Sequence, residues 1–499
     1  MQKYDILIIG SGLGGLICAS ILSKNGYNVC VLEKNHQIGG SIQNFSRDGV
    51  VFDTGAHYVG GLDEGQNLYQ YFKYLGLNDK LNVKKLDINA FDIISFGDDK
   101  KDYPFAMGYE NFKNQLEQYF PEEREALNNY IDKFIEISNV FPLYKLKLPN
   151  SSFMESEYFK ISTNSFLNKL TKNIRLRNVL AGTNLLYAGE TDKTPLYIHS
   201  LINNSYIESA YRFVGGSSQM AELLSDTIKQ NGGTIIKNSE VQEFLFKDKT
   251  ITAVKLANGE EVYADNFISN IHPARTFEMM PKDKLRKVYR NRICELENTI
   301  SVFTLYITLK ENSFNYLNQN IYYYKQNNVW TASTYDKAEW PESYMLLTQA
   351  SDVNNKYANG ITVMAYMKYN ELKKWENTTV EKRGSDYKEF KQKKADELLN
   401  LIEEKFPDIR KHIKSVYTST PLTYRDYIAT KDGSLYGILR DCNEPIKSII
   451  LPKTNVPNLY LTGQNVNLHG VLGVTIGAVL TCAEFIGMDN LITKIKSVQ

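Results

Sequence analysis

The stretch Ile6-Leu7-Ile8-Ile9-Gly10-Ser11-Gly12-Leu13-Gly14-Gly15 joins an apolar run directly to a glycine-rich turn. The apolar run predicts a buried strand, and the apolar pattern that follows the turn predicts a helix. In such a turn Gly10 permits the tight bend, Gly12 lets the backbone approach a pyrophosphate, and Gly15 packs the helix against the strand. The helix N-terminus offers free N–H groups to phosphate. The stretch therefore predicts the start of a dinucleotide-binding fold, with a purely structural turn as the alternative.

A second strand supplies the context that this interpretation requires. Val29-Cys30-Val31-Leu32 ends on Glu33, about 20 residues beyond the turn, where a carboxylate holds the ribose hydroxyls of a bound dinucleotide. We therefore predict that the cofactor is bound by the turn and by the end of this strand, at Gly10, Gly12, Leu13, Gly14, Gly15, Glu33 and Lys34.

Composition narrows the classes of function. The chain has 499 residues, and its 58 Lys and Arg residues balance 57 Asp and Glu residues, so no basic excess favours nucleic acid or purely electrostatic membrane attachment. Five scattered Cys residues favour a reducing cytoplasm, and the six His residues have no metal-ligand spacing. We expect no signal peptide, because the first strand begins so early, and no spanning helix, because no other segment holds about 18 apolar residues in a row.

The nucleotide fold is predicted to be discontinuous. We assign 1–70, 208–280 and 421–499 to cofactor binding, and 71–207 and 281–420 to a substrate domain with mixed helices and strands. The last segment contains a strand at 458–463, a glycine-rich turn and an apolar helix at 474–486. Such a helix would bring a second helix N-terminus to the ligand.

Local patterns predict further elements inside these segments. Helices are expected at 112–119, 122–140 and 388–406, with strands at 301–309 and 361–367. In the middle segment we expect strands at 241–246, 251–256 and 261–263, a hairpin turn at Asn258-Gly259, and a separate buried strand at 265–270. Ser217 or Ser218 is positioned to cap the helix that follows.

At the level of a family, the chain resembles the FAD-dependent phytoene desaturase superfamily, and most closely its carotenoid isomerase and retinol saturase branch. The residues that carry this resemblance are Gly10-x-Gly12-x-x-Gly15, Glu33, Gly39-Gly40, Phe52-Asp53-x-Gly55-x-His57, Gly215-Gly216, Thr462-Gly463 and the segment 421–437. The resemblance implies an α/β fold: a Rossmann-type FAD-binding domain with an α+β substrate domain, in a glutathione-reductase-2-like flavoprotein architecture.

The resemblance also implies further cofactor contacts, at Gly39, Gly40, Ser41, His57, Val241, Gly463, Gln464, Gly473 and Val474. Two positions depart from the family pattern. Ser41 follows the double glycine where Arg is common, and Gln464 follows Thr-Gly where an acid is common. Amides also bond ribityl hydroxyls, so FAD binding is still expected. We expect it to be non-covalent, because Cys482 lies inside the final helix.

Catalytic candidates follow from the same resemblance. His57, His199 and Tyr206 are candidates for proton transfer, with cofactor packing or plain cavity lining as the alternatives. Val214 and Gly215-Gly216 are expected to approach the flavin. Arg425 is interpreted as a structural or flavin-contacting cation rather than a substrate clamp. His469 is expected either near the pyrimidine side of the flavin or in loop packing.

The predicted activity is desaturation, saturation or cis-trans isomerisation of carbon-carbon double bonds in a carotenoid-like or retinoid-like isoprenoid or other apolar lipid, with hydride transfer at flavin N5. A single dinucleotide fingerprint leaves a quinone, oxygen or a redox protein as the electron partner. An FAD-dependent amine or amino-acid oxidase is the alternative enzyme. A lipid-carrying escort of the GDP-dissociation-inhibitor type is the non-enzymatic alternative.

The segment from Phe141 to Phe159 mixes aliphatic, aromatic and Lys side chains. This composition suits a membrane-contacting patch through which a lipid enters, and it equally suits ordinary packing. We therefore expect a cytoplasmic protein, with peripheral contact to the cytoplasmic face of a membrane as an open alternative. The sequence leaves the oligomeric state open.

Overall fold

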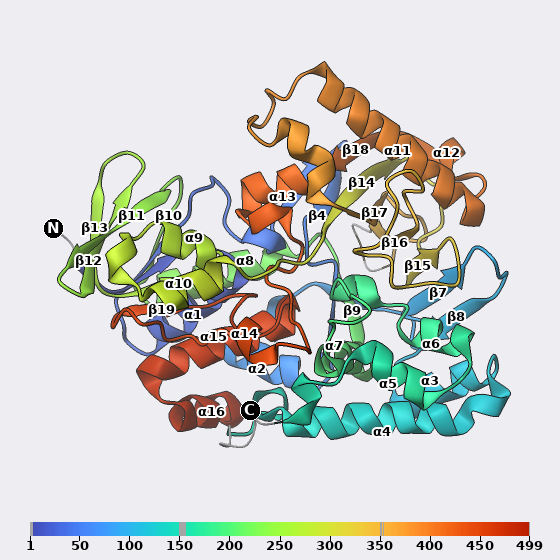
Figure 1. Ribbon diagram of the computed structural model, residues 1–499, viewed down its shortest axis with the longest axis horizontal. Coiled ribbons are helices and arrows are strands. Elements are labelled where there is room, and N and C mark those ends of the chain that lie inside the picture. The colour runs from blue at the N-terminus through green and yellow to red at the C-terminus, as the bar shows by residue number, and fades with distance from the viewer. Residues whose placement is uncertain (1–2, 149–155, 350–351, 353, 499) are drawn as a thin grey trace.

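The computed structural model describes residues 3–148, 156–349, 352 and 354–498. Two sheets organise the chain, and Figure 1 shows them on opposite sides of the molecule, with α13 (Pro421–Ile428) between them. None of the helices in the described residues is long and apolar enough to cross a membrane.

The first sheet has a parallel centre. Its order is β10-β2-β1-β13-β12-β11, and β19 also pairs with β13. Neighbours are parallel from β10 to β13 and between β13 and β19, whereas β12 and β11 form an antiparallel extension. The strands span β1 (Lys3–Ile9), β2 (Val29–Leu32), β10 (Thr234–Ile236), β11 (Val241–Lys247), β12 (Thr250–Leu256), β13 (Glu261–Ser269) and β19 (Leu459–Leu461).

Helices cover this sheet, so strand β1 is buried on both faces. Ile6 and Ile8 pack into one apolar cluster with the helices α1 and α15, while Leu7 and Ile9 face a second cluster, as the two-residue period of a strand requires. The helices of this half are α1 (Leu13–Lys24), α2 (Asn67–Leu75), α8 (Ser218–Gln230), α9 (Pro273–Glu278), α10 (Lys287–Cys294), α15 (Gly470–Ile486) and α16 (Met488–Ser497).

The second sheet is mostly antiparallel, in the order β18-β14-β17-β16-β15-β7-β8. Only the pairing of β15 with β7 is parallel among the described strands of this sheet. Its strands are β7 (Asp92–Phe96), β8 (Asp102–Phe105), β14 (Ser301–Leu309), β15 (Asn320–Tyr324), β16 (Ser343–Gln349), β17 (Gly360–Met367) and β18 (Ile413–Ser419).

The helices of the second half surround this sheet (Figure 1). They are α3 (Tyr109–Glu117), α4 (Arg124–Val140), α5 (Thr163–Leu170), α6 (Ile174–Leu180), α7 (Leu196–Glu208), α11 (Ser385–Lys405) and α12 (Ile409–His412), with α14 (Pro445–Ser448) near the first half. Two small sheets complete the fold, β3 (Asn44–Arg47) with β4 (Val50–Asp53), and β5 (Tyr58–Gly60), β9 (Ala210–Phe213) and β6 (Val83–Lys85).

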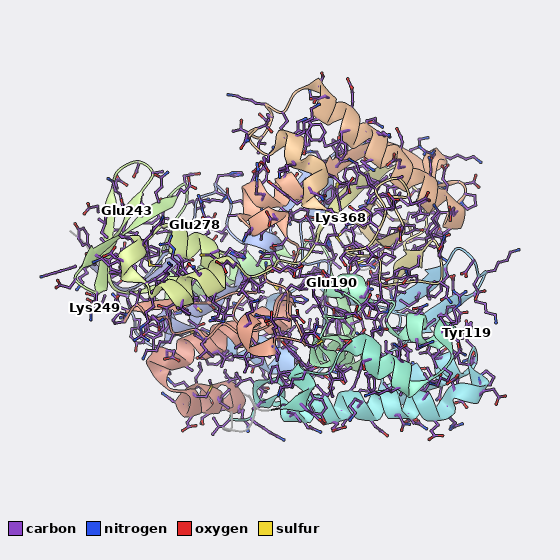
Figure 2. The ribbon with its side chains drawn as sticks, in the orientation of Figure 1. Tyr119, Glu190, Glu243, Lys249, Glu278 and Lys368 are labelled. Carbon is purple, nitrogen blue, oxygen red and sulfur yellow. The ribbon has the colours of Figure 1, made fainter. Side chains whose placement is uncertain are left out.

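The surface mixes charges of both signs, as the balanced composition implies. On the hairpin of β11 and β12, Glu243 and Lys249 point outward into solvent (Figure 2). The predicted α/β fold class is confirmed, with a parallel Rossmann-like sheet and a mixed sheet in the substrate half.

Two local predictions need correction. The strands expected at 261–263 and 265–270 form one continuous strand, β13, because both parts pair with β1, from Lys3↔Tyr263 to Ile9↔Ser269. Ser217 stands at the N-cap position of α8, but its side chain makes no capping bond. Instead, the Ser217 hydroxyl donates to Asp53 Oδ1 over 2.8 Å.

Candidate functional site

A cavity of about 970 Å³ lies where the three cofactor-binding segments meet the substrate half. The residues that follow β1, β2, β13 and β19 all contribute to its wall: Gly10, Glu33, Asn270 and Gly463. These are the carboxyl ends of parallel strands, where ligands of open α/β sheets bind.

Most of the predicted cofactor residues line this cavity together. They are Gly10, Gly12, Leu13, Gly14, Glu33, Lys34, Gly39, Gly40, Ser41, His57, Val241, Gly463, Gln464 and Val474. Gly15 and Gly473 lie outside the lining. An added Cβ on Gly15 would come 2.2 Å from Gly10 O, and one on Gly473 would come 2.6 Å from Leu468 Cβ. Both glycines therefore serve close packing of a helix start.

Asn270 is a wall residue that sequence reasoning missed. It follows β13, its amide donates to Gly10 O over 3.3 Å, and it sits against Gly12, Gly14 and Gly463. A Cβ on Gly14 would meet Asn270 Oδ1 at 2.7 Å and Gly463 Cα at 2.9 Å. The glycines thus let the three segments converge around one amide. Its position directly after a buried strand was the available signal.

Glu33 is buried, and nearby residues of the cavity wall hold its carboxylate in place. Its carboxylate accepts hydrogen bonds from Ser11 N over 3.0 Å, from Ser11 Oγ over 2.6 Å and from Asn35 N over 2.9 Å. A carboxylate offers about four acceptor positions, so this set fixes the group while leaving capacity for a ribose hydroxyl.

Two helices begin at the cavity wall. Gly12 is the N-cap of α1, and α15 starts at Gly470; neither helix start has a side-chain cap or an acidic residue in its first turn. The first backbone N–H groups of a helix have no intrahelical acceptor, and its dipole favours anions there. Both helix starts therefore suit the phosphates and the polar edge of a flavin dinucleotide.

His57 tests whether the cavity wall fits a flavin dinucleotide. It is 6% exposed, it lines the cavity, and neither ring nitrogen has a hydrogen-bond partner among the described residues. Burial, with Arg212 as a second cause, lowers the pKa of His57 to about 4, so the ring is neutral at pH 7. Buried polar atoms are normally hydrogen-bonded. The two ring nitrogens of His57 are available for hydrogen bonds to a bound flavin dinucleotide, so this residue fits the cofactor.

The substrate half contributes a different kind of wall. Its lining residues are Leu186, Tyr206, Met345, Met364, Tyr369, Thr378, Thr379 and Val380. Tyr58, Tyr424, Leu435 and Tyr436 come from the cofactor segments but pack with the core of the substrate half. The charged lining residues belong to the nucleotide half and its rim, among them Glu33, Lys34, Arg275 and Arg425. Among the described lining residues, the substrate half therefore contributes uncharged side chains and the cofactor segments contribute the charged ones.

Of the two catalytic candidates on α7, only Tyr206 lines the cavity. Tyr206 lines the cavity, its hydroxyl donates to Tyr58 O over 3.4 Å, and its ring centroid lies 4.5 Å from that of Tyr58. His199 lies outside the lining. Its Nε2 is 2.8 Å from Tyr130 Oη and its Nδ1 is 2.9 Å from Tyr187 Oη. Burial lowers the pKa of His199 to about 3, so we assign it to packing between α7 and α4.

Other expected flavin neighbours also lie elsewhere. Val214, Gly215 and Gly216 do not line the cavity, and Gly216 instead packs against Asn44 and Asp53. His469 Nε2 lies 3.0 Å from Leu186 O, and its ring stacks on Tyr436 at 4.2 Å. Of the two expectations for His469, loop packing is the one that these contacts support.

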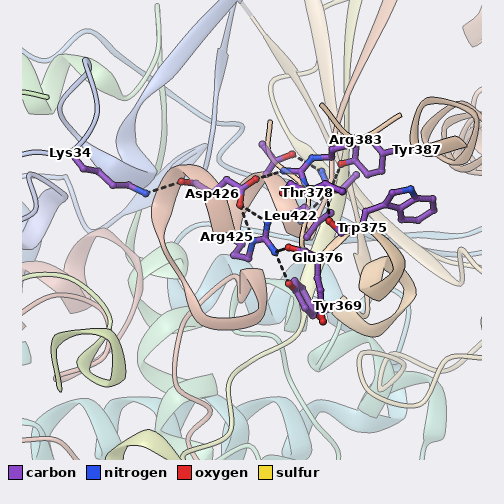
Figure 3. A network of polar contacts seen from close by, with 12 residues as sticks. Lys34, Tyr369, Trp375, Glu376, Thr378, Arg383, Tyr387, Leu422, Arg425 and Asp426 are labelled. Atoms are coloured by element: carbon purple, nitrogen blue, oxygen red, sulfur yellow. Dashed lines mark hydrogen bonds and ion pairs between the residues drawn. The ribbon is translucent and has the colours of Figure 1, made fainter. Parts of the chain in front are cut away.

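A polar network holds α13 across the rim (Figure 3). Lys34 Nζ donates to Asp426 O over 2.8 Å, and the Asp426 carboxylate pairs with both Arg383 and Arg425. Arg425 also donates to Tyr369 Oη over 3.0 Å and to Glu376 O. Arg425 lines the cavity, but its guanidinium donates hydrogen bonds to other residues of the protein. These contacts match the role of a structural cation.

The segment considered for membrane contact is largely packed inward. Phe141 and Phe159 are buried and join Tyr197 in an aromatic cluster, whereas Leu148 is 49% exposed. Pro149, Phe153 and Met154 lie outside the described residues. The described contacts match ordinary packing.

The comparisons with known proteins are consistent with a flavin site. The family described as "Flavin containing amine oxidoreductase" matches residues 13–483. All-trans-retinol 13,14-reductase of Danio rerio is 27% identical, with 98% of this chain and 87% of that protein covered. Chloroplastic prolycopene isomerase 2 of an Oncidium hybrid cultivar is 24% identical, with 98% and 84% covered.

A solved oxidoreductase structure from Methanosarcina mazei has a TM-score of 0.66 at 17% identity, with 95% of this chain and 98% of that chain covered. At 17% identity, the similarity to this structure supports the fold alone. The family match runs from the first residue of α1 to residue 483 within α15, and it covers all of the described cavity wall except Ile9, Gly10 and Gly12. This protein therefore belongs to the family of flavin-containing amine oxidoreductases, which implies FAD as its cofactor.

Proposed function

We propose that this protein is an FAD-dependent oxidoreductase or isomerase that acts on carbon-carbon double bonds of a carotenoid-like, retinoid-like or other apolar chain. The observation that carries the proposal is the division of the cavity. The charged lining residues come from the cofactor segments, and the wall on the side of the substrate half is uncharged and consists mostly of tyrosine, methionine and leucine side chains. An apolar wall removes water from a chain that has no polar groups to satisfy.

The residues have separate tasks in this proposal. Glu33 holds the ribose, the starts of α1 and α15 hold the phosphates and the polar edge of the ring, and His57 bonds the cofactor. A bound FAD supplies hydride transfer. Tyr206, Met345 and Met364 hold the apolar chain and exclude water. The FAD is held non-covalently, because Cys482 is buried inside α15 and does not line the cavity.

The relatives' names support the substrate class. One is named for reducing a double bond of all-trans-retinol and another for isomerising prolycopene. The electron partner in our proposal is a quinone, oxygen or a redox protein, since the sequence has one dinucleotide fingerprint. Peripheral contact with a membrane remains our proposal for how a lipid reaches the apolar end.

The test is to give the FAD-loaded protein all-trans-retinol and a poly-cis carotenoid, with chemically reduced and with oxidised flavin. Accurate mass then distinguishes the reactions. A product heavier or lighter by two hydrogens identifies redox chemistry, and a product of equal mass with altered retention identifies isomerisation. Lipid profiles of source cells with and without the gene give the native chain. Unchanged substrates and unchanged lipid profiles would contradict the proposal.

An amine oxidase is the second candidate, favoured by the tyrosines of the cavity wall. Tyr58, Tyr206, Tyr424 and Tyr436 line one region, and aromatic faces attract cations such as an ammonium. A peroxide assay over a panel of amines and amino acids tests this. Peroxide release with a polar amine, combined with no change in polyenes, would select this candidate. A protein that binds lipid but never binds FAD would select the escort alternative.

A further inference from the structure

A buried carboxyl lies directly behind the cavity wall. Asp92, at the start of β7, is 0% exposed. Its Oδ2 accepts a hydrogen bond from Tyr58 Oη over 2.9 Å, and its Oδ1 accepts one from Asn320 Nδ2 over 2.8 Å. Tyr322 Oη lies 2.7 Å from Tyr58 Oη. Asp92 thus belongs to a compact hydrogen-bonded group that joins β5, β7 and β15.

Tyr58 connects this group to the cavity. Tyr58 lines the cavity beside His57 and Tyr206, whereas Asp92 and Tyr322 do not. The Tyr58 ring lies 4.5 Å from the ring of Tyr206, tilted by 35°, and Tyr206 also lines the cavity. A proton on Asp92 is therefore one hydrogen bond away from the hydroxyl of a tyrosine that lines the cavity.

The surroundings let Asp92 exchange a proton near neutral pH. Burial raises the pKa of Asp92 to about 7, against the opposing effects of Asn320, Tyr58 and Arg212. Tyr322 and Tyr206 face the same group from β15 and α7. Arg212 is tied to Asn320 Oδ1 over 2.7 Å, so its charge is held one residue away. Burial also raises the pKa of Tyr58 well above its ordinary value, so this hydroxyl stays protonated.

We propose that Tyr58 is a catalytic proton donor to the substrate carbon, and that Asp92 is the positioning residue that replaces the proton which Tyr58 gives up. The inference rests on the proposed function. Reduction of a double bond adds a hydride to one carbon and a proton to its neighbour. The proton leaves Tyr58 Oη as the double-bond electron pair forms the new C–H bond. The Asp92 proton then passes to Tyr58 Oη, and solvent later restores Asp92.

The proton balances a hydride that comes from the reduced flavin, so atoms and electrons are accounted for. Desaturation runs the same transfers backwards, with Asp92 as a carboxylate that accepts the proton through Tyr58. Neither transfer requires His199, whose ring nitrogens are bonded to Tyr130 and Tyr187.

The first test reads the proton directly, without turnover. Infrared spectra of the FAD-loaded protein between about pH 5 and 9 report the C=O stretch of protonated carboxyls. We expect a band that disappears as the pH rises through about 7, is missing in Asp92→Asn and is displaced in Tyr58→Phe. Asp53→Asn is the matched control, because Asp53 is another buried carboxyl that accepts hydroxyl bonds, and this variant should retain the band. A band in Asp92→Asn that still disappears near pH 7, rather than near the pKa of about 6 of Asp53, would overturn the inference.

The second test follows turnover. We expect Tyr58→Phe to bind FAD normally and to lose about 100-fold or more in rate, the usual contribution of a positioned acid. Reduction by the wild type should slow as the pH rises through about 7, since it needs protonated Asp92. This dependence should vanish in Asp92→Asn. Tyr71→Phe is the control, because its buried hydroxyl donates to Leu143 O over 2.6 Å, outside the cavity lining.

The outcomes separate the two proposals. Wild-type rates and an unchanged pH profile in Tyr58→Phe would overturn the proton-donor role while leaving the proposed function intact. Inactivity of the wild type on every polyene would contradict the proposed function. In that case the infrared spectra alone decide whether Tyr58 and Asp92 share an exchangeable proton at the cavity wall.

Discussion

Asp53 shows how a single buried carboxylate couples the cofactor segments. It ends β4, it is 2% exposed, and its Oδ1 accepts from Ser217 N over 2.6 Å and from Ser217 Oγ. Two segments far apart in the sequence are thereby joined by one side chain. Burial raises the pKa of Asp53 from 3.8 to about 6, although the Ser217 bonds oppose this shift.

Stability should therefore depend on the ionisation of Asp53. A carboxyl whose pKa is higher in the folded state favours folding below the unfolded pKa, and this advantage is lost as the pH rises through the folded pKa. As the pH rises from about 4 to 6, the wild type should lose up to ~3 kcal/mol in free energy of unfolding that Asp53→Asn does not lose. The variant should therefore become more stable relative to the wild type over this range. Denaturant titrations across this range measure the gain. Asp489→Asn, an exposed control, should show none, and a pH-independent difference for Asp53→Asn would refute the assignment.

Single residues also show where sequence reasoning reaches its limit. His199 and Tyr206 are seven positions apart and so share a helix face, yet about 10 Å of helix axis separates them. The pattern of α7 indicates a buried face but not which turn meets the cavity. The position of the glycines at the cavity wall was predictable because a local motif carries them. Asn270 and Asp92 were not, because their roles depend on pairings between strands distant in the sequence.

At the scale of elements, the contact between α1 and the turn before α15 is the critical one. Gly14 in the first turn of α1 lies against Gly463 and Asn270. Strand predictions were accurate where the pattern was continuous, as for β14, which spans Ser301–Leu309 as expected. The division of β13 into two strands was wrong because Asp265 and Asn266 interrupt the apolar pattern, while pairing with β1 continues past them.

We expect Gly14→Ala to weaken FAD binding at least tenfold and to cost about 1–3 kcal/mol in free energy of unfolding, because its Cβ overpacks the crossing. Gly477→Ala is the matched control in α15. Its Cβ meets neighbours only at 3.6 Å, and alanine favours a helix by up to about 1 kcal/mol over glycine. Fluorescence titration with FAD and denaturant unfolding measure both effects. Equal FAD affinity in the two variants would contradict the packing argument.

The element α13 is a second case, since it ties the rim of the cavity to the end of β2. Asp426→Ala would leave Arg383, whose side chain is 6% exposed, without its carboxylate. Removing one partner of a buried pair costs on the order of 3 kcal/mol, and we expect faster release of FAD as the rim loosens. Stopped-flow transfer of FAD to an apoflavoprotein trap measures release.

Lys374→Ala provides the comparison for Asp426→Ala. Lys374 pairs with Asp386, and their side chains are 70% and 44% exposed, so its loss should cost less than about 1 kcal/mol. Identical FAD release from both variants would show that α13 does not hold the rim.

At the scale of the whole molecule, residues from three separated segments, 1–70, 208–280 and 421–499, and from the segments between them line one cavity. The alternation of cofactor and substrate segments stays a prediction, which rests on the glycine motif that each cofactor segment carries. The sequence could not predict the second sheet in full, since β7 pairs in parallel with β15, more than two hundred positions later. The activity proposed above depends on both ends of the cavity being occupied together.

The most direct test of this account is the flavin content of the purified protein after saturation with FAD and removal of the excess. We expect a yellow protein with one FAD per chain, all of it released into the supernatant by acid precipitation, because we propose that the cavity holds FAD without a covalent bond. A colourless protein that retains no added FAD would contradict the central claim and would favour the lipid-escort alternative.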